Sequence, residues 1–148
     1  MFYDEIDLMI LRELQEDAMT SYRDIAEKLN LSVGTVHNRI KRLKEIGLIK
    51  SFSAIVDAEK LGYGLTAIVL MQVEGEKIVE VEEKLATSKS IIAVYDTTGE
   101  FDIIAIGKFK NREHLNTFIK EALKIQAIKR TVTSIALNVV KEDLRIKF

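Results

Sequence analysis

The sequence has 148 residues and a net charge of −1, with 30% charged and 47% hydrophobic side chains, a balance typical of one ordinary domain or two small ones. It contains no cysteine, which excludes disulfides, thiolate metal sites, iron–sulfur clusters and cysteine nucleophiles. The longest apolar runs, such as AIVLM and IIAV, are far shorter than the roughly 20 residues of a membrane helix, and the acidic N-terminal MFYDEIDLM is unlike a secretory signal, so we expect a cytoplasmic protein without membrane association.

Three short helices are expected in the first 50 residues. The first is capped by Asp4 and runs to about Glu16, with apolar residues at helical spacing. The second follows Ser21 and ends near Asn30, and Ser32 caps the third, which ends near Gly47. The short second helix, the tight turn and the small Ala26, which allows close helix crossing, predict a helix-turn-helix with the third helix in the recognition position.

The exposed side of the third helix combines cations with hydrogen-bonding side chains. Residues 33 to 50 hold five bases against one acid, whereas residues 4 to 17 hold one base against six acids. Cations neutralise phosphates, and amide, hydroxyl and imidazole groups read base edges. Charge alone is equally typical of a solvated helix face, but the helix-turn-helix context favours DNA, with the acidic first helix pointing away from it. The predicted DNA-binding residues are Ser32, Gly34, Thr35, His37, Asn38, Arg39, Lys41, Arg42 and Lys50, of which Thr35, His37 and Asn38 are base-edge candidates and Arg39, Lys41, Arg42 and Lys50 phosphate candidates.

The rest of the chain predicts a second domain. Residues 51–64 read as a linking strand and a glycine-containing hinge, which gives domains at 1–50 and 65–148. Beyond the hinge we expect a strand (65–73), a helix (76–86), two strands joined at 98–100, a helix (112–123) and a last strand. This β-α-β-β-α-β order is the ferredoxin-like arrangement, an antiparallel sheet with both helices on one face, so the fold class is α+β.

Two of the expected strands are apolar at consecutive positions, in TAIVLMQV and IIAVYDT. A strand with only one covered face would alternate apolar and polar residues. Since no residues remain to cover the second face of the sheet, we expect a second copy to pack against it and form an obligate homodimer.

The segment TTGEFD, residues 97–102, lies between two apolar runs. From the residues alone, a hairpin turn that needs Gly99 for its backbone shape is the favoured interpretation. The alternative is a ligand loop, because a zwitterionic amino acid needs N–H donors for its carboxylate and an anion for its ammonium group. Thr98, Gly99, Glu100 and Asp102 supply such groups, and Asp102 interrupts a strand where a carboxylate gains little from packing.

The sequence resembles the Lrp/AsnC family of leucine-responsive and asparagine-regulating transcription factors, also called feast/famine regulators, over essentially its full length. The resemblance rests on Asp7 with Ile10 and Leu11, on the block RDIAEKLNLSVGTVHNRIKRLKEIGLI and on the GEFD motif. It implies an N-terminal winged helix-turn-helix that binds double-stranded DNA, a linking strand, and a C-terminal ligand-sensing domain that dimerises and often assembles four dimers into an octamer. It also implies that an amino acid or related metabolite binds between dimers near GEFD, with Phe101, Thr131 and Thr133 as further candidates, and alters assembly and DNA affinity.

Two rival functions stay open from the sequence. An enzyme is disfavoured because the only histidines, His37 and His114, lack metal-binding company and because HExxH, phosphate-loop and nucleophile-elbow motifs are absent, so we expect no cofactor. The architecture also resembles siroheme decarboxylases, against which the basic third helix weighs. The second rival is an architectural DNA-binding protein without an effector, which uses phosphate contacts almost alone.

Overall fold

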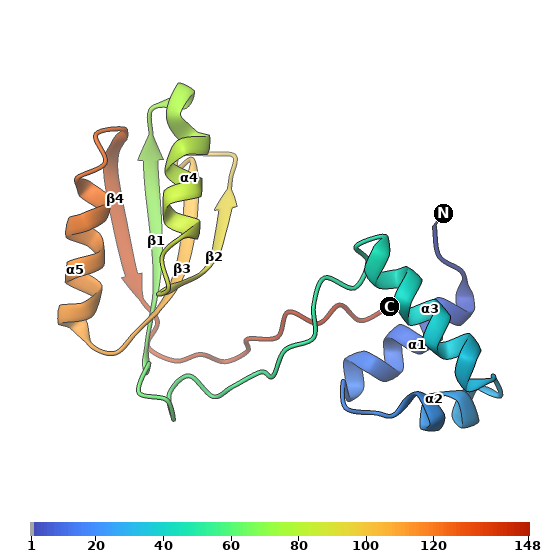
Figure 1. The fold of residues 1–148 in the computed structure, drawn as a ribbon. Coiled ribbons are helices and arrows are strands. Elements are labelled where there is room, and N and C mark those ends of the chain that lie inside the picture. The colour runs from blue at the N-terminus through green and yellow to red at the C-terminus, as the bar shows by residue number, and fades with distance from the viewer. Residues whose placement is uncertain (1) are drawn as a thin grey trace. The chain divides into compact units, whose positions relative to one another are not determined.

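The computed structural model describes residues 2–148. The chain divides into two compact units, one containing the chain up to Ile55 together with Asp143–Phe148, the other containing Val56–Glu142 (Figure 1). This division by compactness differs from the boundaries predicted from the linking segment and its glycines, because it places the break at residue 55 and assigns the last six residues to the first unit. Residues 51–64 pair with no strand of the described chain; instead of a linking strand, the segment contains a hydrogen-bonded turn, in which the Tyr63 N–H donates to the Ala58 carbonyl at 2.8 Å.

The first unit consists of three helices, α1 (Glu5–Glu16), α2 (Tyr22–Leu29) and α3 (Val33–Glu45). Their N-termini are capped as expected: the side chains of Asp4, Ser21 and Ser32 accept the backbone N–H three residues further on. Asn30 closes α2 in the left-handed conformation, with φ of 53°, so that α3 begins after a short turn. The helices enclose an apolar core formed by Ile10, Leu14, Ile25, Ala26, Val36 and Ile40.

The second unit has the predicted β-α-β-β-α-β order. Its elements are β1 (Leu65–Val73), α4 (Ile78–Ala86), β2 (Ile91–Asp96), β3 (Ile103–Phe109), α5 (Arg112–Leu123) and β4 (Ile128–Ile135). A separate 3₁₀ turn, η1 (Gly75–Lys77), precedes α4, where the sequence predicted one continuous helix from residue 76. The backbone of Lys77 is not α-helical, with φ of −114° and ψ of 8°, and it provides no side-chain cap for α4. The strands form one sheet in the order β2-β3-β1-β4, with each neighbouring pair antiparallel.

Both helices of this unit cover the same face of the sheet (Figure 1). Val69 and Met71 of β1 and Ile103 and Ala105 of β3 point toward α4 and α5 and are fully buried. The alternate residues point to the opposite face, because successive side chains of a strand alternate between faces. That outer face carries Ile68, Leu70, Ile104 and Ile106, all only partly buried in the single chain. None of the described helices is long and apolar enough to span a bilayer.

Candidate functional sites

The outer side of α3 is open to solvent. Most of the predicted DNA-binding residues are exposed, and only Thr35 and Arg39 are half-buried. The Ser32 hydroxyl accepts the Thr35 N–H at 3.0 Å and lies 2.8 Å from the Thr35 hydroxyl, so these two side chains hold each other. A Cβ on Gly34 would meet only the Ser32 Oγ, at 3.8 Å. Packing within the unit therefore does not require glycine at position 34, and the surface there is free to approach a partner closely.

Two of the four predicted phosphate-binding cations are paired with carboxylates of α1. The Nη1 of Arg39 donates to both Asp4 oxygens at 2.7 Å and to Asp7 Oδ1 at 2.9 Å, and Arg42 donates to Asp7 Oδ2. Lys41 lies 3.9 Å from Glu45 with both side chains exposed, and Lys50 has no ionic partner among residues 2–148. The acids of the first helix were expected to point away from DNA. The sequence did not predict that Asp7 of α1 and its N-cap Asp4 pair with arginines of α3.

The pKa of Asp4 is lowered from 3.8 to about 2, chiefly by the hydrogen bond from the Arg39 guanidinium. A carboxyl group whose pKa is lower in the folded state stabilises that state above its unfolded pKa, and the contribution is lost as the pH falls through the folded value. The charge of Asp4 thus contributes to stability at neutral pH and ceases to contribute near pH 2.

Replacing Asp4 by Asn should therefore destabilise the first unit in a pH-dependent way. Asparagine caps a helix as well as aspartate, so the substitution removes mainly the charge that faces Arg39. We expect the wild type to have a higher urea midpoint than Asp4→Asn at pH 7, and the difference to shrink as the pH falls from about 5 toward 2. Circular dichroism at pH 7, 4 and 2.5 measures it; a difference that stays constant down to pH 2.5 would contradict the role of the charge.

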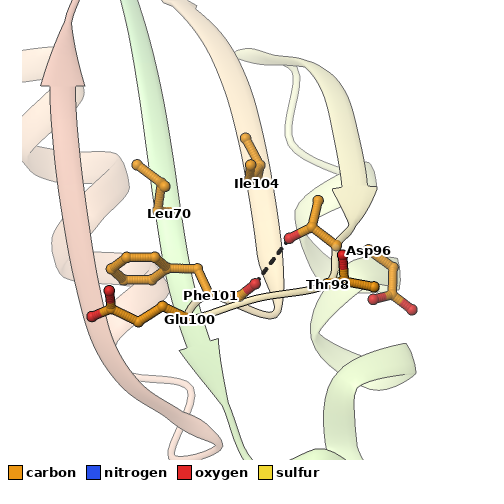
Figure 2. Close-up of a pocket in the computed structure, with 7 residues that line it drawn as sticks. Leu70, Asp96, Thr98, Glu100, Phe101 and Ile104 are labelled. Atoms are coloured by element: carbon orange, nitrogen blue, oxygen red, sulfur yellow. Dashed lines mark hydrogen bonds between the residues drawn. The ribbon is translucent and has the colours of Figure 1, made fainter.

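The segment between β2 and β3 forms a pocket with the outer face of the sheet. The pocket measures about 590 Å³ and is lined by Leu70, Asp96, Thr97, Thr98, Glu100, Phe101 and Ile104 (Figure 2). The Thr97 hydroxyl donates to the Phe101 carbonyl at 2.9 Å, the bond marked in Figure 2, and Gly99 has φ of 116°, a conformation that L side chains rarely adopt. The segment is thus a glycine-dependent turn, and its side chains line a pocket as well.

Arg130 of β4 lies beside this turn and is a residue that the sequence prediction missed. Its Nη1 is 3.2 Å from Glu100 Oε1, and its guanidinium carbon is 5.6 Å from the centre of the Phe101 ring. Gln72 of β1, which pairs with Arg130 across the sheet, donates to the Glu100 carbonyl at 2.9 Å. A cation and a carboxylate therefore lie side by side at the pocket.

The structure brings Thr98, Glu100 and Phe101 together at the pocket but not the other candidates. Asp102 Oδ2 accepts the Val73 N–H at 2.7 Å, a bond that joins the turn to β1. Thr131 and Thr133 pair with Met71 and Val69, and opposite residues in an antiparallel pair share one face. The two threonines therefore lie on the helix-covered face of the sheet, away from Leu70 and Ile104.

Comparison with known proteins gives matches over both units. A winged helix-turn-helix DNA-binding model matches residues 3–50, and an Lrp/AsnC ligand binding domain model matches residues 66–146. An uncharacterized HTH-type transcriptional regulator of Pyrococcus furiosus is 48% identical over 144 residues, 97% of each chain. HTH-type transcriptional regulator FL11 of the same organism is 41% identical over 143 residues, 97% of this chain and 95% of its own. The solved structure of E. coli AsnC has the same fold, with a TM-score of 0.87 at 24% identity over 97% of both chains.

Proposed function

This chain belongs to the Lrp/AsnC family of transcriptional regulators, and we propose that it is a sequence-specific regulator whose assembly and DNA affinity respond to an amino acid or a related small metabolite. The relatives are named as transcriptional regulators, not as enzymes, and the chain carries both a DNA-binding helix-turn-helix and an Lrp/AsnC ligand-binding domain. We further propose which residues bind DNA, which bind the effector, and through which surface two copies form a dimer.

The proposed DNA-binding surface is the open, basic side of α3. His37 and Asn38 are exposed and can reach base edges in the major groove; Ser32, Gly34 and Thr35 lie at the N-terminal end of the same helix, where close approach is possible. Lys41 and Lys50 are exposed cations for phosphates. In a dimer, two such helices enter successive major grooves about 34 Å apart on a near-palindromic site.

The outer face of the sheet is the proposed dimer surface. Ile68, Leu70, Ile104 and Ile106 form neighbouring pairs across β1 and β3, because Ile68 is opposite Ile106 and Leu70 is opposite Ile104. A contiguous apolar face without a covering layer is a liability for a monomer. Two copies that present the same face to each other form a closed, two-fold symmetric pair, which further contacts between pairs can extend to an octamer.

Effector binding is proposed at Arg130 and Glu100, at the turn beside the pocket. Leu70 and Ile104, which also line the pocket, belong to the proposed dimer surface, so a second copy closes that side of the site. An amino acid has a carboxylate, which the Arg130 guanidinium can bind, and an ammonium group, which Glu100 can bind. Both side chains are more than half exposed in the single chain, so their mutual ion pair is weak and can be exchanged for contacts with a ligand. An effector that binds one assembly better than another shifts DNA affinity by that difference, typically about 1 to 3 kcal/mol.

A thermal-shift screen of the twenty amino acids tests whether one of them binds. The Arg130→Gln variant then tests whether it binds beside Arg130. We expect the variant to need roughly tenfold or more of the stabilising amino acid for the same shift, because it loses a charge-assisted hydrogen bond. Arg112→Gln is the matched control, since Arg112 is an exposed arginine of the same unit, whereas Arg130 is the one that contacts Glu100 and Phe101 of the pocket. An equal response in both variants would place the effector elsewhere, and a flat screen of the wild type would favour the architectural alternative.

A further inference from the structure

A buried carboxylate lies beneath the helix that carries the DNA-binding residues. Asp7 is in the first turn of α1, and its side chain is 0% exposed. It accepts the backbone N–H of Asp4 at 2.9 Å and guanidinium N–H groups from both Arg39 and Arg42. Carboxylates are rarely buried unless donors surround them, and three donors surround this one. Asp7 therefore links α1 to two arginines that lie one turn apart on α3.

The two arginines differ in the number of carboxylates that hold them and in the exposure of their side chains. Arg39 is held by Asp4 as well as by Asp7, and its side chain is only 23% exposed. Arg42 has Asp7 as its one carboxylate partner within the described part of the chain, and its side chain is 47% exposed. A guanidinium has five N–H donors in a rigid fork, so it can hold one carboxylate and still donate to a second anion. Arg39, held by two carboxylates and mostly buried, is the less available of the two to a phosphate, whereas Arg42 has one carboxylate partner and the more exposed guanidinium.

We propose that Asp7 is a positioning residue for DNA binding: it keeps Arg39 out of phosphate contact and orients Arg42 so that its remaining N–H groups meet a backbone phosphate. The inference rests on the proposed binding of DNA by α3. An arginine that is already anchored loses less side-chain freedom when it binds a phosphate. Phosphate contacts fix the register of a recognition helix, and base contacts depend on that register. Loss of Asp7 should therefore reduce sequence preference more than total affinity.

A purely structural role for Asp7 leads to a different expectation. If Asp7 only joined α1 to α3, its removal would weaken binding to every duplex equally, in proportion to the folded fraction. The charge change acts in the opposite direction, because Asp7→Asn leaves the cation of Arg42 uncompensated and strengthens attraction to any duplex. The ratio of affinities for specific and random DNA separates the two roles.

The experiment compares full-length Asp7→Asn with Glu13→Gln. Glu13 is the matched control because it also lies on α1 and carries one negative charge, but it pairs with Lys28 of α2, at 2.7 Å, instead of with α3. Dissociation constants are measured at several salt concentrations for two duplexes, one selected by the wild-type protein from a random library and one random, at a temperature where circular dichroism shows each variant to be folded.

For Asp7→Asn we expect the affinity ratio of selected to random duplex to fall about tenfold, the size of one lost base or register contact, while affinity for the random duplex at low salt does not fall. For Glu13→Gln we expect the ratio to stay within about twofold of the wild type. An equal loss on both duplexes in Asp7→Asn overturns the proposal. A wild-type protein with no salt-dependent affinity for any duplex would instead contradict the proposed function itself.

If Asp7→Asn does not fold, variants of the two arginines test the proposal instead. Arg42→Gln should reduce the slope of log K against log salt concentration by about 0.9, the value for one phosphate contact, and the exposed Lys41 provides the comparison, because Lys41→Gln should do the same. Arg39→Gln should leave the slope unchanged and lower the thermal midpoint. A reduced slope for Arg39→Gln, or an unchanged slope for Arg42→Gln, overturns the proposed division between the two arginines.

Discussion

Ile106→Asp should convert the proposed dimer into a folded monomer. Ile106 lies on β3, opposite Ile68 of β1 and Ala93 of β2, and points away from the helices. In a single chain this position is only partly buried, so an aspartate there stays hydrated and the unit keeps its fold. In a dimer that packs the two outer faces together, symmetry buries one new carboxylate from each copy, at a cost of several kcal/mol. We expect the dimer dissociation constant to rise by about a thousandfold or more.

Analytical ultracentrifugation at micromolar concentration measures this change. Val79→Asp is the matched control, because Val79 is an apolar residue of α4 with 65% exposure and receives the same charge on the helix layer of the same unit. The control should remain dimeric, while Ile106→Asp should sediment as a monomer with an unchanged circular dichroism spectrum. A dimeric Ile106→Asp would mean that two copies pair through a different surface, and the proposed spacing of the recognition helices would lose its basis.

The parts of the fold that local signals determine were predictable from the sequence. The N-terminal caps Asp4, Ser21 and Ser32 and the left-handed Asn30 act within one helical turn of themselves, and these residues located α1, α2 and α3. The strands and helices of the second unit were predictable because the spacing of apolar residues changes between that of a strand and that of a helix. The order β-α-β-β-α-β, and with it the ferredoxin-like fold, depended only on recognising each element in turn.

Pairings between distant residues were not predictable in the same way. Asp7 and Arg39 are 32 positions apart, and Glu100 and Arg130 are 30 positions apart; nothing local to either member identifies its partner. The sequence does contain a hint, because the two acids Asp4 and Asp7 and the two arginines Arg39 and Arg42 each have the spacing of one helical turn. Such spacing indicates that each pair shares a face of its helix, but the crossing of α1 and α3 decides whether the faces meet.

Strand register explains why the pocket differs from its prediction. Thr131 and Thr133, two residues apart on β4, share one face, but which face depends on how β4 pairs with β1, and a shift of one residue exchanges the faces. The observed register places Arg130 and Val132 on the outer face, opposite Gln72 and Leu70. The residue of β4 that lies beside the turn is therefore Arg130 and not one of the two threonines.

Phe109→Ala should destabilise the second unit by about 3 to 5 kcal/mol, the usual cost of truncating a buried phenylalanine, and leave the helix-turn-helix unit intact. Phe109 is fully buried, with its ring centre 5.5 Å from that of Phe118 and 5.3 Å from that of His114. Its ring also fills the space left by Gly107, where an added Cβ would lie 2.6 Å from Phe109 Cε2. Because β3 pairs with strands on both sides, the backbone cannot move inward to close the cavity.

The two units have separate cores. Phe109 belongs to the core of the second unit, whereas Ile10, Ile25 and Ile40 belong to the core of the first. Native-state hydrogen exchange should therefore accelerate by two or more orders of magnitude for amides of β1 and β3 and remain unchanged for amides of α2 and α3. Leu123→Ala, at a half-exposed position of α5, is the control and should change exchange little in either unit. If Phe109→Ala accelerates exchange equally in both units, the chain unfolds as one cooperative body, and an effector in the second unit would act on DNA binding through shared stability as well as through assembly.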